Sequence, residues 1–183
     1  MKTIPAVLDQ RNVATQIVLI IGASAIIAIA AQIAIPLPFT PVPLTMQPLA
    51  VVMVGVVLGA WRGAAAAVLY LLEGVSGLPV FAQGHGGALW LLGPTAGYLY
   101  SYPLAAFVAG WFSQRGWGSS TVRALAGMLT ALAVIYAGGW AWLAILSGPR
   151  AAFTMGIVPF VVADIVKIAI GAALLPYAQR LIR

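Results

Sequence analysis

Charged residues are almost absent from this chain, and their scarcity decides which solvent the fold needs. Only 7% of its 183 residues are charged, compared with about 25% in an ordinary soluble domain. Apolar residues account for 63%, so a soluble fold would have too few polar groups to cover its surface, and the same hydrophobicity excludes intrinsic disorder. We therefore expect the chain to fold in a lipid bilayer.

Apolar segments separated by prolines, glycines and arginines set the expected topology. A bilayer core takes about 20 apolar residues per helix, so a chain of this length has room for about five or six crossings. We predict an all-α, polytopic membrane protein with a single six-helix bundle over residues 1–183. The first segment follows a short basic N-terminus and is interpreted as a retained helix rather than a signal peptide. The expected spans are 15–35, 49–61, 64–73, 95–112, 124–146 and 156–179.

Two of the connections differ from simple turns. Residues 36–48 contain five prolines, which cannot form a regular helix and predict an ordered extended loop. Residues 74–94 are rich in glycine but also apolar. Because irregular backbone at membrane depth needs cover from protein or a cavity, a solvated linker is a poor interpretation of this second loop.

Basic residues are distributed unevenly between the two sides of the predicted bundle. The N-terminus, the turn at Arg62, the turn 115–123 and the C-terminus lie on one side and carry seven basic residues, whereas the opposite loops carry only Arg150. The positive-inside rule therefore predicts that both termini are cytoplasmic and that both unusual loops face outward. This topology accounts for the net charge of +6, so we expect no nucleic-acid partner.

Residue types that perform catalysis or hold metals are scarce. The chain has no cysteine and one histidine, which excludes thiol chemistry and argues against a metal site. It has no nucleophile–histidine–acid set and no P-loop, so we expect neither an enzyme nor an ATPase, and no cofactor.

The sharpest feature is the pair Asp164 and Lys167 in the last apolar segment. Each such group costs about 2.5–3.5 kcal/mol at the centre of a membrane on insertion scales, and residues three apart share one helix face. One interpretation is an ion pair that neutralises itself between helices. The other is a polar site whose acceptors and donors suit a compact ligand with both N–H and C=O groups.

Aromatic and polar residues around the two loops are further candidates. Tyr98 and Tyr102 share a helix face, and Trp90 lies shortly before them; all three fit either an interfacial aromatic belt or a pocket wall. Glu73 is either an interfacial charge or a stabiliser of the adjacent loop. His85 fits a hydrogen-bonded scaffold residue as well as a ligand contact.

Small residues recur in the first apolar segment. Ala30 and Ala34 lie four residues apart. Because small residues at this spacing let another helix approach closely, they are a candidate docking face for a partner.

Five motifs occur in order along residues 36–167. In this combination they resemble the BioY family, the biotin-binding S components of energy-coupling factor (ECF) transporters. The motifs are Pro41-Val-Pro-Leu-Thr-Met-Gln-Pro-Leu-Ala50, Leu58-Gly-Ala-Trp-Arg-Gly63, Gly77-Leu-Pro-Val-Phe-Ala82, Gly93-Pro-Thr-Ala-Gly-Tyr98 and Pro159-Phe-Val-Val-Ala-Asp164-Ile-Val-Lys167.

The resemblance implies a six-helix S-component fold in the bacterial cytoplasmic (inner) membrane. Its outer loops would close over a high-affinity site for biotin, the transported ligand. It also implies two kinds of partner, a transmembrane coupling protein and two ATPase subunits, with the small-residue face of the first segment as the contact to the coupling protein.

Site residues follow from the same resemblance. The family's Asp and Lys fall on Asp164 and Lys167, and its Thr-x-Gln falls on Thr45 and Gln47. We expect Asp164 to accept from a ureido N–H of biotin, and Lys167 to donate to the ureido oxygen or steady Asp164. Arg150, a glutamine or backbone donors are alternatives for the carboxylate. The apolar walls and further contacts are expected from Phe81, Gln83, His85, Trp90, Tyr98 and Tyr102.

Other functional classes remain open at this stage. Asp164 and Lys167 would also suit a stand-alone, proton-coupled transporter of another small molecule. An intramembrane enzyme has no supporting motif. A structural subunit without a ligand would leave the two elaborate loops without a purpose.

Overall fold

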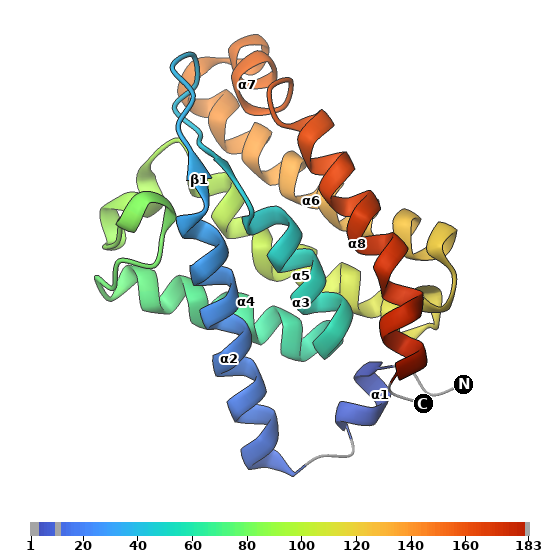
Figure 1. Ribbon diagram of the computed structural model, residues 1–183. Helices are drawn as coiled ribbons and strands as arrows, with labels where there is room; N and C mark the ends of the chain where they lie inside the picture. Colours follow the sequence, from blue (N-terminus) through green and yellow to red (C-terminus); the bar gives the residue numbers. More distant parts are fainter. Residues whose placement is uncertain (1–3, 10–11, 182–183) are drawn as a thin grey trace.

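The computed structural model describes residues 4–9 and 12–181 as a bundle of helices with one short β-hairpin (Figure 1). The hairpin joins β1 (Ala34–Ile35) to β2 (Leu44–Thr45), and three short 3-10 helices lie in the loops: η1 (Ala82–Gly84), η2 (Ala88–Leu92) and η3 (Trp117–Ser119). Eight α-helices occur in the described residues: α1 (Ile4–Asp9), α2 (Val13–Gln32), α3 (Gln47–Leu58), α4 (Ala60–Val75), α5 (Ala96–Gln114), α6 (Thr121–Ser147), α7 (Pro149–Gly156) and α8 (Val161–Leu181).

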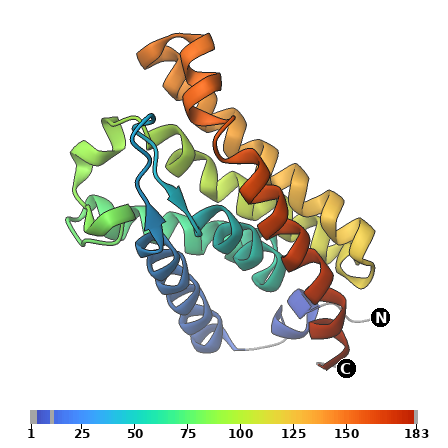
Figure 2. The same cartoon turned by 45° about the horizontal axis from the view of Figure 1, so that its top comes forward.

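The two unusual loops lie at the same end of the bundle. Figure 2 shows the hairpin beside the loop that connects α4 to α5, whereas α1 and the last turns of α8 lie side by side at the other end. The hairpin tip also reaches α7, because the Thr40 hydroxyl donates to the Met155 carbonyl at 2.8 Å. The loops and α7 therefore form one cap over the helices.

The first helix is shorter than the expected span 15–35. It ends at Gln32, and Ala34 pairs with Thr45 in an antiparallel register. Pro36 explains the difference, because proline lacks the N–H that a helix needs and forces the residue before it into an extended conformation. The proline-rich segment thus folds back on itself as a hairpin.

The last helix begins five residues after the start of the expected span 156–179. The chain forms the short helix α7, turns over residues 157–160, and begins α8 at Val161, with a bend of 50° between the two helices. Pro159 lies in this turn rather than in the first turn of a continuous helix. As a result Asp164 sits in the first turn of α8.

Length and hydropathy identify the strongest membrane spans. Among the described residues, α2 and α6 are each long and apolar enough to cross a bilayer, and the bent pair α7–α8 provides a third candidate. Helices α3 and α4 have 12 and 16 residues, fewer than the roughly 20 that a bilayer core takes. The spans expected for these two helices, 49–61 and 64–73, are likewise shorter than about 20 residues.

Glycines allow α5 to pack closely against its neighbours. A Cβ on Gly55 of α3 would lie 2.2 Å from the Ala106 carbonyl oxygen of α5, and a Cβ on Gly139 of α6 would lie 2.2 Å from the ring of Tyr98. Small residues at helix contacts are the usual means of close packing in membrane proteins. The second contact matters for the site, because it fixes the ring of Tyr98.

Candidate ligand-binding site

A pocket lies beneath the cap, between the hairpin and the helices α3, α5, α6 and α8. Its cavity has a volume of about 50 Å³. Aliphatic side chains and prolines from the hairpin and helices form much of its wall. The polar and aromatic lining residues are Thr45, Gln47, Trp90, Thr95, Tyr98, Tyr102, Tyr136, Phe160 and Asp164.

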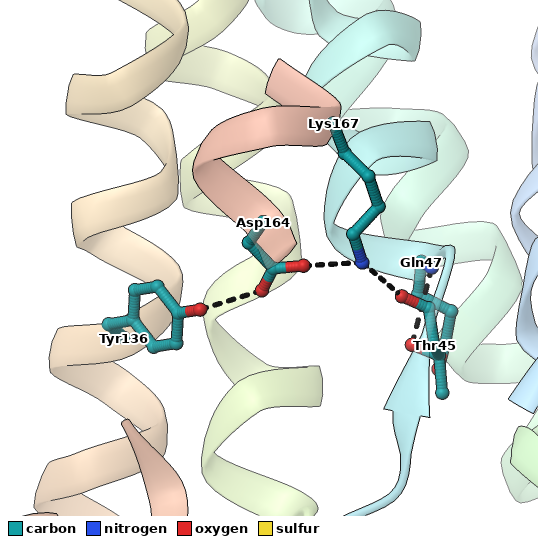
Figure 3. Close-up of polar contacts among 5 residues, drawn as sticks. All are labelled: Thr45, Gln47, Tyr136, Asp164 and Lys167. Atoms are coloured by element: carbon teal, nitrogen blue, oxygen red, sulfur yellow. Dashed lines mark hydrogen bonds and ion pairs between the residues drawn. The ribbon is translucent and has the colours of Figure 1, made fainter. Parts of the chain in front are cut away.

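Asp164 is held by groups from two helices, and β2 holds its lysine partner in turn (Figure 3). Its Oδ1 lies 2.5 Å from Nζ of Lys167 on the same helix, and its Oδ2 accepts from the Tyr136 hydroxyl of α6 at 2.7 Å. The Lys167 ammonium also donates to the Thr45 carbonyl of β2 at 2.8 Å. Because Asp164 is only 4% exposed, this arrangement compensates a charge that would otherwise be costly to bury.

The ion pair keeps hydrogen-bonding capacity for a ligand. An ammonium has three N–H donors, and Lys167 directs two toward Asp164 and Thr45. Asp164 Oδ1 contacts the ammonium but accepts no hydrogen bond of regular geometry within the described residues. Asp164 lines the pocket, whereas Lys167 is not among the lining residues and supports the carboxylate from beside it.

Gln47 is oriented by a chain of hydrogen bonds. The Tyr70 hydroxyl donates to the Val80 carbonyl at 3.2 Å and accepts from Gln47 Nε2 at 2.8 Å. The amide nitrogen of Gln47 is thus committed to Tyr70. Its Oε1 makes no hydrogen bond to any residue that the structure describes, so it is an available acceptor in the pocket wall.

The two tyrosines of α5 play different parts. The Tyr98 hydroxyl donates to the Gly156 carbonyl at 2.6 Å, so its ring is a fixed wall. Tyr102 is 3% exposed and lines the pocket, yet its hydroxyl bonds to no residue in the described part of the chain. Because buried hydroxyls nearly always find a partner, this one is suited to a bound molecule.

Comparison with known proteins identifies the family. The model of the BioY family matches residues 2–183. The chain belongs to the BioY family. The chain is 42% identical over 145 residues to a protein named "Probable biotin transporter BioY" from Pyrococcus horikoshii, covering 79% of this chain and 84% of that protein. It is 39% identical over 162 residues to the "Biotin transporter BioY" of Rhizobium etli, covering 83% and 86%.

A solved structure shares the fold of this BioY-family chain. It is described as the S-component for biotin from an ECF-type ABC transporter and superposes with a TM-score of 0.81 at 24% identity. The match covers 91% of this chain and 92% of the other. The helical bundle with its cap is therefore the S-component fold.

In the loop after α4, the predicted lining residues separate into two groups. Trp90 lines the pocket, whereas Phe81, Gln83 and His85 do not. Phe81 is fully buried and packs edge-on against the Tyr70 ring. Gln83 is exposed and has a φ of +61°. His85 stacks on the Trp90 ring, with 3.9 Å between the ring centroids.

Gln32 explains this arrangement of the loop. Its amide nitrogen donates to the Phe81 carbonyl at 3.1 Å, and its oxygen accepts from the Gly84 N–H at 3.0 Å. The end of α2 thus fixes the loop backbone so that Ala82, rather than its neighbours, faces the pocket. His85 then acts as support for Trp90, with its Nδ1 2.8 Å from the Ala82 carbonyl.

The predicted small-residue docking pair does not lie on one helix face. Ala30 is 8% exposed within α2, and Ala34 lies in β1. Ser24 of the same helix donates to Glu73 of α4 at 2.5 Å, so Glu73 ties two helices together. Isoleucines and valines, rather than alanines, make up most of the exposed face of α2. Arg150 is exposed at the start of α7 and does not line the pocket.

Tyr136 is the functional candidate that the sequence interpretation missed. It lies in the middle of the apolar segment 124–146, whereas tyrosines of the interfacial belt lie near segment ends. A tyrosine in the middle of an apolar segment, rather than near its end, was the sequence signal that could have identified Tyr136. Its aspartate partner is 28 residues away in sequence and on another helix, so the contact itself depends on the tertiary fold.

Proposed function

We propose that this chain captures biotin from outside the cell and is the substrate-binding membrane subunit of an ATP-driven importer. The observation that carries the proposal is the buried Asp164, paired with Lys167, at the wall of an otherwise largely apolar pocket in a chain of the BioY family. The relatives named as biotin transporters support the choice of ligand.

The pocket chemistry fits the three parts of biotin. A ureido N–H donates to Asp164 Oδ1, and the ureido oxygen accepts from the free donor of Lys167. Gln47 Oε1 offers a second acceptor for the other ureido N–H. Trp90 and Tyr98 enclose the apolar bicycle. The carboxylate tail then extends toward the cap, where Thr95 is the nearest lining hydroxyl donor on α5.

Transport requires partners in this proposal. The chain contains no P-loop, so ATP hydrolysis must come from separate ATPase subunits, joined through a transmembrane coupling protein. The description of the structural relative as part of an ECF-type ABC transporter supports this assembly. The basic residues favour cytoplasmic termini, an outward cap and a place in the inner membrane.

Biotin binding by the purified chain tests the proposal. Asp164→Asn and Lys167→Ala are expected to weaken binding by roughly 10-fold or more, because each leaves a buried partner unpaired. Arg150→Ala is the matched control, since it removes an exposed charge outside the pocket and leaves affinity unchanged. Wild-type affinity in a correctly folded Asp164→Asn protein would refute the contact.

A further inference from the structure

An apolar groove runs along the surface of the bundle between α5 and α6, and none of its lining residues also lines the ligand-binding pocket. The groove has a volume of about 540 Å³ and follows α6 from Val134 to Ile145. Glycines form its floor, because a Cβ on Gly97 of α5 would lie 2.3 Å from the Gly138 carbonyl oxygen of α6. Leu104 and Ile145 at its edges are 57% and 79% exposed, so the groove opens toward the surrounding lipid.

The groove offers a bound molecule apolar contacts. Among the described residues that line it, three carry polar side-chain atoms, and all three of these side chains are hydrogen-bonded within the protein. Tyr100, Trp142 and Ser101 each donate to a backbone carbonyl, at 2.7, 2.9 and 2.6 Å. The part of an occupant that lies in the groove is therefore a hydrocarbon.

The dimensions of the groove distinguish a lipid chain from a second protein helix. Val134 and Ile145 are 11 residues apart, so the groove is about 16 Å long at the helical rise of about 1.5 Å per residue. The volume of 540 Å³ divided by this length gives a mean cross-section of about 33 Å². A helix about 10–12 Å across needs roughly 80–110 Å². The groove thus fits a single hydrocarbon chain but not a helix.

A cation without an acidic partner lies close to the cap end of the groove. A second surface hollow, of about 490 Å³, begins at Ser147, two residues beyond Ile145, and contains Arg150 of α7. Arg150 is exposed, no acidic residue lines this hollow, and Arg150 forms no ion pair within the described part of the chain. In the predicted topology Arg150 is also the sole basic residue of the loops on this side of the membrane. A negatively charged partner at this end of the bundle therefore has one cation to bind.

We propose that the groove and Arg150 together bind one anionic glycerophospholipid, with an acyl chain between α5 and α6 and its phosphate at Arg150. The rings of Tyr100 and Trp142, 5.7 Å apart, lie at this end of the groove, and such aromatic residues are enriched at the level of the lipid head groups. A single arginine favours a lipid with one net negative charge, such as phosphatidylglycerol, over a zwitterionic lipid. The site is separate from biotin binding, because neither hollow shares a lining residue with the pocket.

Native mass spectrometry of the purified full-length chain tests the lipid site. Phosphatidylglycerol and phosphatidylcholine with the same acyl chains are added in turn. The wild-type chain is expected to retain one phosphatidylglycerol, roughly 5-fold more strongly than phosphatidylcholine. Arg150→Gln is expected to abolish this preference, whereas Arg123→Gln, at an exposed position at the other end of α6, keeps it.

A second pair of variants tests the groove itself. Ala141 is exposed and lines the groove, so Ala141→Phe fills it and is expected to weaken retention of both lipids by roughly 10-fold. Val162→Phe, at an exposed position on α8 outside the groove, leaves retention unchanged. Because Arg150 is exposed, Arg150→Gln tests the proposal even if Ala141→Phe lowers stability.

Four results would overturn the proposal. Three of them are equal retention of the two lipids by the wild-type chain, an unchanged preference in Arg150→Gln, and unchanged retention in a folded Ala141→Phe protein. The fourth is a dimer, in place of the lipid-bound monomer, that disappears in Ala141→Phe, because it would show that a second copy of the chain covers the groove.

Discussion

Replacing Gln47 by leucine separates ligand contact from structural support. Gln47 is 4% exposed, donates to the Tyr70 hydroxyl at 2.8 Å and lines the pocket. Leucine has a similar volume, so the substitution removes polar groups without opening a large cavity. Tyr70 keeps its hydrogen bond to the Val80 carbonyl, so the loss of unfolding free energy is about 1 kcal/mol, the value of one typical internal hydrogen bond.

The effect on biotin affinity is expected to be larger. Loss of Gln47 Oε1 leaves a ureido N–H of the bound ligand without an acceptor in a dry pocket, at a cost of about 1–3 kcal/mol. This corresponds to a dissociation constant raised roughly 5- to 150-fold. Isothermal titration calorimetry in detergent measures the affinity, and thermal unfolding of the ligand-free chain measures the stability.

Tyr70→Phe is the matched control. It leaves Gln47 Nε2 without its partner and removes one of the two hydrogen bonds to the Val80 carbonyl, which also accepts from Gln32 Nε2 at 3.3 Å, but retains the amide oxygen for the ligand. We expect a greater loss of stability than in Gln47→Leu and a smaller loss of affinity. If Gln47→Leu binds biotin as tightly as the wild type, or if Tyr70→Phe loses as much affinity with unchanged stability, the assigned contact is wrong.

Three further substitutions test other parts of the site. Gly139→Ala places a Cβ 2.2 Å from the Tyr98 ring and is expected to lower the free energy of unfolding by about 1–3 kcal/mol through overpacking. Gly22→Ala is the control: a Cβ at this position meets no neighbouring atom within 4 Å, so the melting temperature stays near that of the wild type. Gln32→Ala releases the loop after α4, so the amide hydrogen exchange of that loop increases and biotin dissociates roughly 10-fold faster. Unchanged exchange and dissociation rates would show that Gln32 does not hold the loop in place. Tyr102→Phe weakens biotin binding by roughly 5-fold or more and leaves stability unchanged, because the hydroxyl lines the pocket and has no partner among the described residues. Equal affinity would show that the hydroxyl contacts no ligand.

Asp164 and Lys167 could be singled out from the sequence because charged residues within an apolar membrane segment carry a high free-energy cost. Asp164 and Lys167 stand in an apolar segment at a spacing that puts them on one helix face, and the structure pairs them there. Thr45 and Gln47 likewise reach the pocket, through a segment whose prolines forbid helix until α3 begins. Helix spacing and the positions of prolines place these residues, and both can be read from a single sequence.

The expected and observed placements differ where distant residues decide which way a side chain points. Phe81 and His85 were assigned to the pocket from their place in a glycine-rich loop, but Gln32, about 50 residues away, fixes which side of that loop faces inward. The bend between α7 and α8 likewise combines the effect of Pro159 with packing against the hairpin through Thr40. Side-chain directions in an irregular loop depend on such partners, and no local pattern specifies them.

A structure of the chain at saturating biotin tests the central claim most directly. We expect the ureido ring within hydrogen-bonding distance of Asp164 Oδ1 and Lys167 Nζ, with Tyr136 still donating to Oδ2 and the hairpin closed over the ligand. Biotin bound elsewhere, with the ion pair intact and the pocket beneath the cap empty, would contradict the account.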